Sequence, residues 1–230
     1  KKYYPEIKKI VLSGGCALNV TANGKLLESN IVDEIIIPPA PHDAGCAIGA
    51  ALCGINKNID YKSVRSPYLG KNFSNEEIYE ELSKTCKNNL FKLKEDDLIK
   101  KTANYLKEGK LIGWFQGGAE FGPRALGARS FLADPRNDLI RDQINQKIKK
   151  RELFRPFAPS TLKEASNEFF NLQQDSPYMN IVAKVRNKKI PAVTHIDGTA
   201  RVHTISNNMH SRYYKLVNYF GKITGIPVIL

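Results

Sequence analysis

Arginines and lysines alternate with glycines and prolines between Gly117 and Ser160. The cations of this stretch are Arg124, Arg129, Arg136, Arg141, Lys147, Lys149, Lys150, Arg151 and Arg155. A planar guanidinium fork matches two anionic oxygens when its stem is held still, and glycine and proline turns fix the backbone that carries it. The stretch therefore predicts a preorganised pocket for phosphate or carboxylate groups.

Two positions in this stretch are aimed by rigid turns. Residues 121–124 (FGPR) fix a turn that directs Arg124, and Arg129 with Ser130 adds a second cation and a hydroxyl. The alternative is a surface of ion pairs that uses Asp134, Asp138, Asp142 and Glu152. Exposed ion pairs do not require this density of glycine and proline, so the pocket is favoured.

A predicted helix carries further polar residues toward the same region. Asn145 and Lys149 lie one turn apart on it, and Arg155 follows in a segment that its prolines keep from being helical throughout. Downstream, Arg201 begins a predicted strand after His195 and Asp197. These last two could form an acid–base pair, but a turn in which Asp197 bonds its own backbone is favoured.

Two weaker signals precede the cationic stretch. Gly14 and Gly15 follow a predicted strand and precede a helix, where backbone N–H groups can approach a phosphate, although a simple tight turn fits as well. Asn19 would then hold the loop or a ligand. Asp43 follows His42 at the start of a helix and is either a helix cap, favoured by position alone, or a hard oxygen ligand.

The elements that position these residues predict an α/β fold. A buried strand (9–12), a helix (17–28), a strand (34–37) and a helix of small residues (44–52) come first. Residues 56–71 read as a linker, after which Ser74 and Glu77 form a helix-capping box. The further predictions are helices at 97–108, 138–149 and 213–220 and strands at 111–115, 179–185 and 201–205.

Composition limits the kinds of protein that this chain can be. The formal net charge of the 230 residues is +12, which favours anionic partners. No leading apolar segment resembles a signal peptide, no apolar run is long enough to span a membrane, and the four cysteines lack metal-ligand spacing. We therefore expect a cytoplasmic protein. The apolar run 226–230 and the strand-like start lead us to expect a piece of a longer polypeptide.

Five blocks of the sequence together carry a family resemblance. LSGGCALNVTANGKLL, PHDAGCAIGAAL, GWFQGGAEFGPRALGARSFLADPR, NQKIKKRELFRPFAPS and HIDGTARV, in this order, closely resemble the O-carbamoyltransferases of nodulation and antibiotic biosynthesis, the tobramycin and cephamycin type included. The resemblance implies that residues 1–60 end an actin-like ATPase (Kae1-like) domain. It also implies that residues 61–230 form a YrdC-like α/β domain with a twisted mixed sheet, truncated at its C-terminus.

The resemblance also implies a reaction. Carbamoyl phosphate and ATP would give carbamoyl-adenylate in the YrdC-like domain, with release of phosphate and pyrophosphate. A divalent metal, iron or magnesium, would then assist transfer of the carbamoyl group to the hydroxyl of a small-molecule acceptor in the actin-like domain. The cations have a physical task in this scheme, because two phosphorylated substrates repel each other unless their charges are neutralised.

Positions in the family motifs assign roles to individual residues. Contacts to carbamoyl phosphate and to the ATP phosphates fall on Arg124, Lys149, Arg155 and Arg201, with Arg129, Ser130 and Asn145 as second choices. Asp43 matches the metal-ligand aspartate, which raises it above the cap interpretation. Gly14, Gly15 and Asn19 match the nucleotide loop.

The sequence departs from the family pattern in three respects. The histidines that complete the metal site would lie upstream of residue 1, and the family's Asn-Thr-Ser-Phe-Asn motif would follow residue 230. His203 stands where glutamine is more usual. We therefore expect the N-terminal half of the same polypeptide to be a partner of this chain, which alone should lack transfer activity.

Two other functions compete with this prediction. A basic YrdC-like module could bind RNA, but here the basic residues alternate with acids, so nucleic acid is disfavoured. An enzyme that makes tRNA threonylcarbamoyl-adenylate would use threonine and bicarbonate, and the block FGPRALGARS argues against it. No membrane partner is expected.

Overall fold

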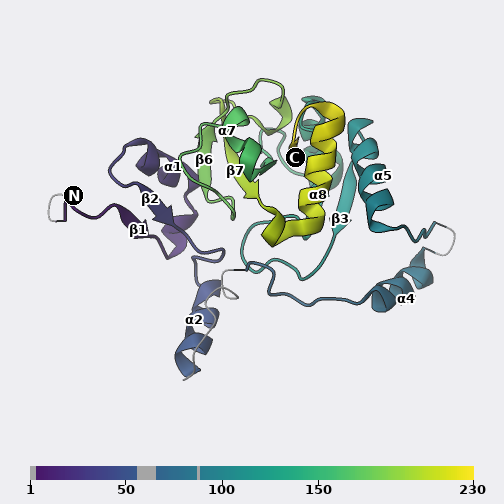
Figure 1. Cartoon of the computed structure of the whole chain (residues 1–230), viewed down its shortest axis with the longest axis horizontal. Coiled ribbons are helices and arrows are strands. Elements are labelled where there is room, and N and C mark those ends of the chain that lie inside the picture. Colours follow the sequence, from purple (N-terminus) through teal and green to yellow (C-terminus); the bar gives the residue numbers. More distant parts are fainter. Residues whose placement is uncertain (1–3, 56–65, 87–88) are drawn as a thin grey trace.

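Two groups of elements lie side by side in the computed structural model, which describes residues 4–55, 66–86 and 89–230 (Figure 1). The first group covers residues 4–55 and the second covers the remainder. Most of the predicted linker, residues 56–65, lies outside the described residues.

The first group is built on a two-stranded parallel sheet. Strands β1 (Lys9–Val11) and β2 (Glu34–Ile36) pair so that Ile10 lies opposite Ile35. These two side chains face a small apolar core, but the prediction of a buried first strand was wrong, because Val11 on the opposite face is 68% exposed. With two strands and one covered face, the sheet leaves its other face open.

Asn19 divides the predicted helix at 17–28 into two elements. A short 3₁₀ helix, η1 (Gly15–Leu18), comes first, and α1 (Val20–Glu28) follows. The side chain of Asn19 accepts a hydrogen bond from the Ala22 N–H at 3.0 Å, which makes it the N-cap of α1. Asparagine is among the preferred residues at this position, so it starts a helix here rather than continuing one.

The predicted helix of small residues at 44–52 forms, but it does not pack into a core. Helix α2 (Ala44–Gly54) has no buried residue, and Figure 1 shows it extending away from the two sheets. Asp43 stands at its N-cap position with helical backbone angles, but its side chain makes no capping hydrogen bond. The cap alternative for Asp43, which the family resemblance ranks below a metal ligand, is therefore wrong.

The second group contains the remaining helices and strands. Ser74 and Glu77 form the predicted capping box at the start of α4. The elements in chain order are α4 (Asn75–Thr85), α5 (Glu95–Lys107), β3 (Ile112–Phe115), β4 (Arg129–Leu132), α6 (Leu139–Gln143), η2 (Ile144–Lys149), β5 (Ser160–Leu162), η3 (Lys163–Ala165), α7 (Ser166–Phe169), β6 (Ile181–Lys184), η4 (Pro191–Val193), β7 (Thr199–Ile205), α8 (Asn207–Thr224) and β8 (Val228–Ile229).

The larger sheet of the second group is mixed, as predicted. Its order is β6-β7-β5-β8, with β5 parallel to β7 and the other neighbours antiparallel. Helices α5 and α8 pack on each other, and the buried Leu106 and Phe220 belong to the same core cluster as Ile205 of β7. Strand β4, which was not predicted, pairs antiparallel with β3 to form a separate hairpin-like sheet.

The two groups meet where α1 lies on β6. A Cβ atom added to Gly24 would collide with the carbonyl oxygen of Val182, so helix and strand approach at backbone distance. Ile181 of β6 joins the same core cluster as Leu27 and Ile35 of the first group. The first group is thus anchored to the edge of the larger sheet.

Within residues 4–55, 66–86 and 89–230, no helix combines the length and the apolar character that crossing a membrane requires.

Candidate functional site

Four cations from three separate segments converge on one pocket of about 300 Å³. Arg124 comes from the turn before β4, Lys149 and Arg151 from η2 and its end, and Arg201 from β7. Ser130 also lines the pocket. Among the described residues that line it, none has a carboxylate side chain. The pocket thus concentrates positive charge without an internal counter-charge.

Two arginines of this pocket, Arg124 and Arg201, have poorly solvated guanidinium groups. The Nε atoms of Arg124 and Arg201 are buried and have no hydrogen-bond partner. Burial, together with the nearby charges of Arg124 and Arg151, lowers the pKa of Arg201 to about 10. Burial also lowers the pKa of Arg124. An anion bound here would relieve both the repulsion and the missing hydrogen bonds.

A carboxylate beneath the turn fixes the backbone that carries Arg124. Glu120 Oε1 accepts hydrogen bonds from the N–H groups of Leu126 and Ala128 at 2.7 and 2.8 Å. Tyr68 Oη donates to the carbonyl oxygen of Leu126 at 2.8 Å. The charge of Glu120 is thereby directed to backbone amides rather than to the pocket cations.

Two glycines allow this turn to pack closely. Gly127 has φ +92°, and a Cβ atom there would collide with the ring of Tyr213. Gly122 has φ +134°, and its added Cβ would lie 2.5 Å from the carbonyl oxygen of Pro39. Only glycine takes up both the left-handed backbone and the close approach.

Asn145 holds Arg151 in place. It is fully buried on the π-helical element η2, and its Oδ1 accepts from Arg151 Nε at 2.7 Å. Its Nδ2 donates to the carbonyl oxygens of Leu153 and Arg155 at 3.2 and 2.9 Å. Asn145 therefore positions Arg151 rather than facing the pocket itself. Lys149, by contrast, is exposed, with its Nζ 4.9 Å from the centre of the Phe131 ring.

Two predicted phosphate contacts lie outside the set of lining residues. Arg155 is about half exposed and pairs with Glu152 at 2.9 Å. Arg129 lies 3.4 Å from the centre of the Phe115 ring and donates to the carbonyl oxygens of Gln116 and Gly117. Their assignment as phosphate contacts stays a prediction. The alternative of a surface of ion pairs is correct for Arg155, and also for Arg136 with Asp134 and Arg141 with Asp142. It does not apply to the arginines that line the pocket.

A second pocket, of about 380 Å³, lies in the first group. Its lining includes Gly14, His42 and Asp43, with the proline-rich segment 38–41 between them. The Gly14 N–H donates to the carbonyl oxygen of Pro41 at 2.7 Å, which brings the predicted nucleotide loop beside Asp43. Gly15 is not among the lining residues, and Asn19 caps α1 instead.

Asp43 alone does not make a metal site. Its side chain is exposed, and His42 Nδ1 beside it is buried without a partner. The part of the chain that the structure describes contains no group of three or more His, Cys, Asp or Glu side chains that could hold a metal ion. These residues therefore supply at most part of a coordination set.

The pair His195 and Asp197 forms the expected turn. Asp197 Oδ1 accepts from the Thr199 N–H at 3.0 Å and from Thr199 Oγ1 at 2.6 Å. His195 Nδ1 lies 3.1 Å from the same hydroxyl. The turn interpretation is confirmed, and it sets the start of β7, which carries Arg201.

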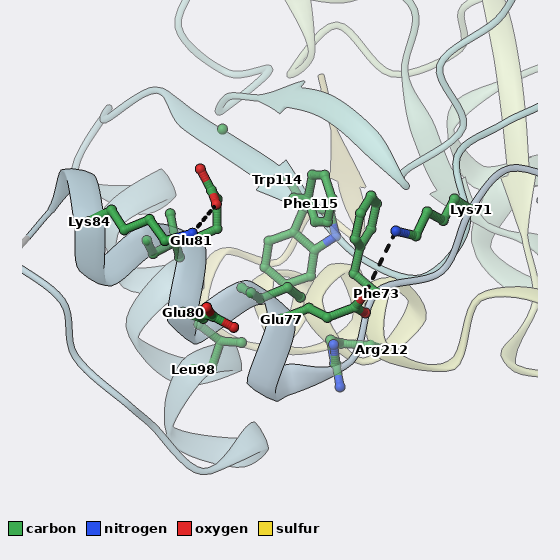
Figure 2. Close-up of a pocket in the computed structure, with 13 residues that line it drawn as sticks. Lys71, Phe73, Glu77, Glu80, Glu81, Lys84, Leu98, Trp114, Phe115 and Arg212 are labelled. Carbon is green, nitrogen blue, oxygen red and sulfur yellow. Dashed lines mark hydrogen bonds and ion pairs between the residues drawn. The ribbon is translucent and has the colours of Figure 1, made fainter.

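Figure 2 shows a larger cavity, of about 890 Å³, between α4 and β3. Its centre is aromatic, with Phe73, Trp114 and Phe115, and its rim carries the ion pairs Lys71–Glu77 and Lys84–Glu81. The charged groups are paired at the rim rather than converging inside. Volume alone would favour this cavity, but unpaired cations distinguish the smaller pocket as the site of anion chemistry.

Sequence reasoning missed several residues of the cationic pocket. Arg151 was named among the cations of the stretch but was assigned no role, although its place two residues after Lys149 is a usable signal. Met179, Ser160 and Tyr213 also line the pocket, and no local pattern marks them. They are brought there by the larger sheet and by α8.

Family models match both groups of elements. The model described as carbamoyltransferase N-terminus matches residues 2–52, and the model described as carbamoyltransferase C-terminus matches residues 103–230. The second match covers the whole cationic pocket.

Curated relatives extend over nearly all of this chain. It is 45% identical to nodulation protein NolNO of Sinorhizobium fredii, 43% identical to nodulation protein NolO of Bradyrhizobium diazoefficiens and 34% identical to nodulation protein U of Rhizobium tropici. These alignments cover 97, 96 and 98% of the chain but 34, 42 and 38% of the respective relatives. The chain thus spans little more than a third of their length.

Proposed function

This chain belongs to the carbamoyltransferase family, and from that premise we propose that the pocket around Arg124 and Arg201 binds carbamoyl phosphate and ATP and forms carbamoyl-adenylate. The observation that carries the proposal is the presence of two buried arginine Nε atoms without partners in a pocket whose described lining has no carboxylate side chain. Such an arrangement is unfavourable for the free protein and favourable for a polyanion.

The chemistry requires charge neutralisation more than acid–base catalysis. A carbamate oxygen attacks the α-phosphorus of ATP, the bond to the bridging oxygen breaks, and pyrophosphate leaves. Carbamoyl phosphate supplies the carbamate and releases phosphate, so one water molecule enters the overall balance. Each of these steps brings anionic oxygens together, and fixed cations stabilise the charge that develops on them.

The pocket cations would neutralise phosphate charge in different ways, because some are held rigidly and one is exposed. Arg124 and Arg201 are held by a rigid turn and by a sheet strand, and they bind phosphate oxygens in fixed geometry. Arg151 is held by Asn145 and adds a third fixed fork. Lys149 is exposed and adjusts to the substrate from the rim. Arg155, Arg129 and Ser130 remain candidates of second rank in this scheme.

The second pocket receives the carbamoyl group in this proposal. Gly14, Gly15 and Asn19 belong to its nucleotide loop, and Asp43 offers one oxygen ligand to a divalent metal, iron or magnesium. A metal at this place would polarise the carbamoyl carbonyl for attack by the acceptor hydroxyl. Because the described residues do not complete a coordination set, no step is assigned to it.

We further propose that the whole reaction needs sequence beyond this chain. Residues 1–60 would end a Kae1-like transfer domain and residues 61–230 would belong to a YrdC-like domain. Helix α2, which buries none of its residues, and the open face of β1–β2 with Val11 and Ile36 offer apolar surface to the preceding part of the first domain. That part would also carry contacts to the acceptor.

Convergence of the cations supports a small anion over RNA as the ligand. RNA-binding surfaces spread cations along a groove that follows the backbone, and aromatic side chains stack on the bases. Here four cations point at one pocket of about 300 Å³ within the described part of the chain. This volume suits phosphate groups rather than a strand.

The proposal is tested by pyrophosphate release from the full-length polypeptide. Release should require both ATP and carbamoyl phosphate, and Arg124→Ala and Arg201→Ala should each abolish most of it. A variant of an arginine outside the pocket, Arg186→Ala, should leave it unchanged. Release that persists in both pocket variants would refute the assignment of the site.

A further inference from the structure

The side-chain amide of Asn23 joins the two groups of elements. Its Nδ2 donates to the carbonyl oxygen of Ala17 at 2.9 Å and to that of Asn180, also at 2.9 Å. The residue is 3% exposed on α1. Since the amide nitrogen carries two protons, both of its donors are used, one on each side of the junction.

The acceptor on the second group lies next to a residue in an unfavourable conformation. Met179 has φ +54°, a left-handed backbone that non-glycine residues with long side chains rarely adopt. It is buried and lines the cationic pocket with Arg124 and Arg201. Such a conformation persists only where its surroundings hold it.

Hydrogen bonds at Asn180 supply this constraint. Its carbonyl oxygen accepts from Asn23, and its Nδ2 donates to the carbonyl oxygen of Ile37 at 3.4 Å. Helix α1 lies at backbone distance from β6 at Gly24, so no side chain can fill the space between them. Asn180, the residue that follows Met179, is thereby fixed to the first group through both its side chain and its carbonyl group.

The other acceptor of Asn23 belongs to the loop of the second pocket. Ala17 N–H donates to the carbonyl oxygen of Gly14 at 3.0 Å, and Gly14 N–H donates to that of Pro41 at 2.7 Å. Gly14 and Pro41 both line the second pocket. One amide therefore connects the backbone of both pockets.

We propose that Asn23 is a positioning residue for the anion pocket: it holds Met179 in the left-handed conformation and fixes that wall relative to the Gly14 turn. It acts through Asn180 and lines neither pocket. This inference rests on the proposed function in one respect, namely that the pocket binds phosphate groups.

Gln174 offers a matched control at the same junction. Its side chain accepts from the Ile35 N–H and donates to the Ile35 carbonyl oxygen, each at 2.9 Å. Like Asn23, it is an amide that joins the two groups by two hydrogen bonds to backbone atoms. Neither of these two hydrogen bonds involves Asn180, so their loss should weaken the junction without releasing Met179.

The experiment measures pyrophosphate binding to the 230-residue chain by titration calorimetry. Asn23→Ala should weaken binding at least about fivefold, because the free chain then populates conformations in which the wall at Met179 is displaced. Gln174→Ala should change affinity less than about twofold while lowering the melting temperature. In a Met179→Gly background, where glycine adopts positive φ without cost, Asn23→Ala should lose most of its effect on affinity.

The possible results distinguish a failure of the proposed role of Asn23 from a failure of the proposed function. Absence of pyrophosphate binding to the wild-type chain contradicts the proposed function. Three outcomes overturn the role of Asn23. The first is equal pyrophosphate affinity of the wild type and Asn23→Ala. The others are an equal loss of affinity in Gln174→Ala, and a loss of affinity in Asn23→Ala that persists in the Met179→Gly background. If Asn23→Ala does not fold, Asn23→Ser is measured against the same controls, with the same loss and the same rescue expected.

Discussion

Arg124 and Arg201 face the same pocket from a turn and a strand, and each leaves a buried Nε without a partner. Burial is the main reason that the pKa of Arg201 falls to about 10, and the charges of Arg124 and Arg151 add to it. At neutral pH both guanidinium groups are charged, so they repel each other in the free pocket. A bound polyanion removes this repulsion and completes the hydrogen bonds.

Removing one pocket arginine should therefore separate binding from stability. Arg124→Gln should weaken pyrophosphate binding by about 10- to 100-fold, as expected for loss of a charge-assisted hydrogen bond worth about 1.5–3 kcal/mol. The free energy of unfolding should stay constant or rise, because repulsion with Arg201 is relieved. Calorimetric titration and thermal unfolding measure the two effects, and Arg186→Gln provides the charge-matched control. A parallel loss of stability in Arg124→Gln would contradict this account of the pocket.

The carboxylate of Glu120 should be needed for the shape of the turn rather than for its charge. Glu120→Ala leaves the N–H groups of the buried residues Leu126 and Ala128 unsatisfied, which should cost about 2 kcal/mol or more. Hydrogen exchange at these two amides should become faster, and pyrophosphate binding should weaken about tenfold. Glu120→Gln keeps an acceptor oxygen and should retain most of both properties. Equal behaviour of the two variants would contradict the prediction.

Two glycines with positive φ provide a test of close packing. Gly127→Ala places a Cβ against the Tyr213 ring, whereas Gly198→Ala, at φ +75°, meets nothing within 4 Å. Both variants carry backbone strain of about 1 kcal/mol, and Gly127→Ala should lose about 1–3 kcal/mol more through steric overlap. Denaturant unfolding measures the difference. Similar losses in both variants would show that Tyr213 can move away.

Glu95 should give α8 a pH-dependent attachment to α5. It bonds Lys215 Nζ at 2.6 Å and Arg212 Nε at 3.2 Å, and the hydrogen bond from Lys215 is the main cause of its lowered pKa. A carboxyl whose folded pKa is lowered stabilises the fold above its ordinary pKa of 4.5, and this stabilisation is lost as pH falls through the folded value. Because the side chains are partly exposed, Glu95→Gln should cost only about 0.5 kcal/mol at pH 7.

The measurement compares unfolding free energies of the wild type and Glu95→Gln from pH 7 to pH 3. The difference should be constant down to about pH 5 and should shrink below pH 4.5. Glu108→Gln, which breaks an exposed pair with Lys110, is the control of similar charge change. A difference that grows on acidification would have the wrong sign for this mechanism.

Local patterns predicted most of the elements that carry the site. The capping box at Ser74 and Glu77, the helix that became α5 and the strand before the cationic stretch were all predicted from the sequence and form as expected. These features depend on hydrogen bonds and side-chain spacing within a few residues. Other strands were missed: β4 (RSFL) and β5 (STL) carry polar residues and so form no apolar run, and β8 has only two residues.

Burial and side-chain roles were predicted less well than the elements. Asp43 does not cap α2, Val11 is exposed, and Asn145 turns its amide to Arg151 and to backbone carbonyls. In each case the outcome depends on which surface another segment covers. The residues on either side of a position in the sequence do not indicate which surface a distant segment covers.

The sequence by itself determined that guanidinium groups would be presented on tight turns, because proline fixes φ and glycine permits the positive φ angles that such turns need. It also determined the family to which the chain belongs. Only the tertiary structure decided which cations share a pocket: it brings Arg151 and Arg201 beside Arg124 and leaves Arg155 with Glu152. The physical reason is that Coulomb energy and desolvation depend on distance and burial in space, which the sheet, α8 and the Asn23 junction set together.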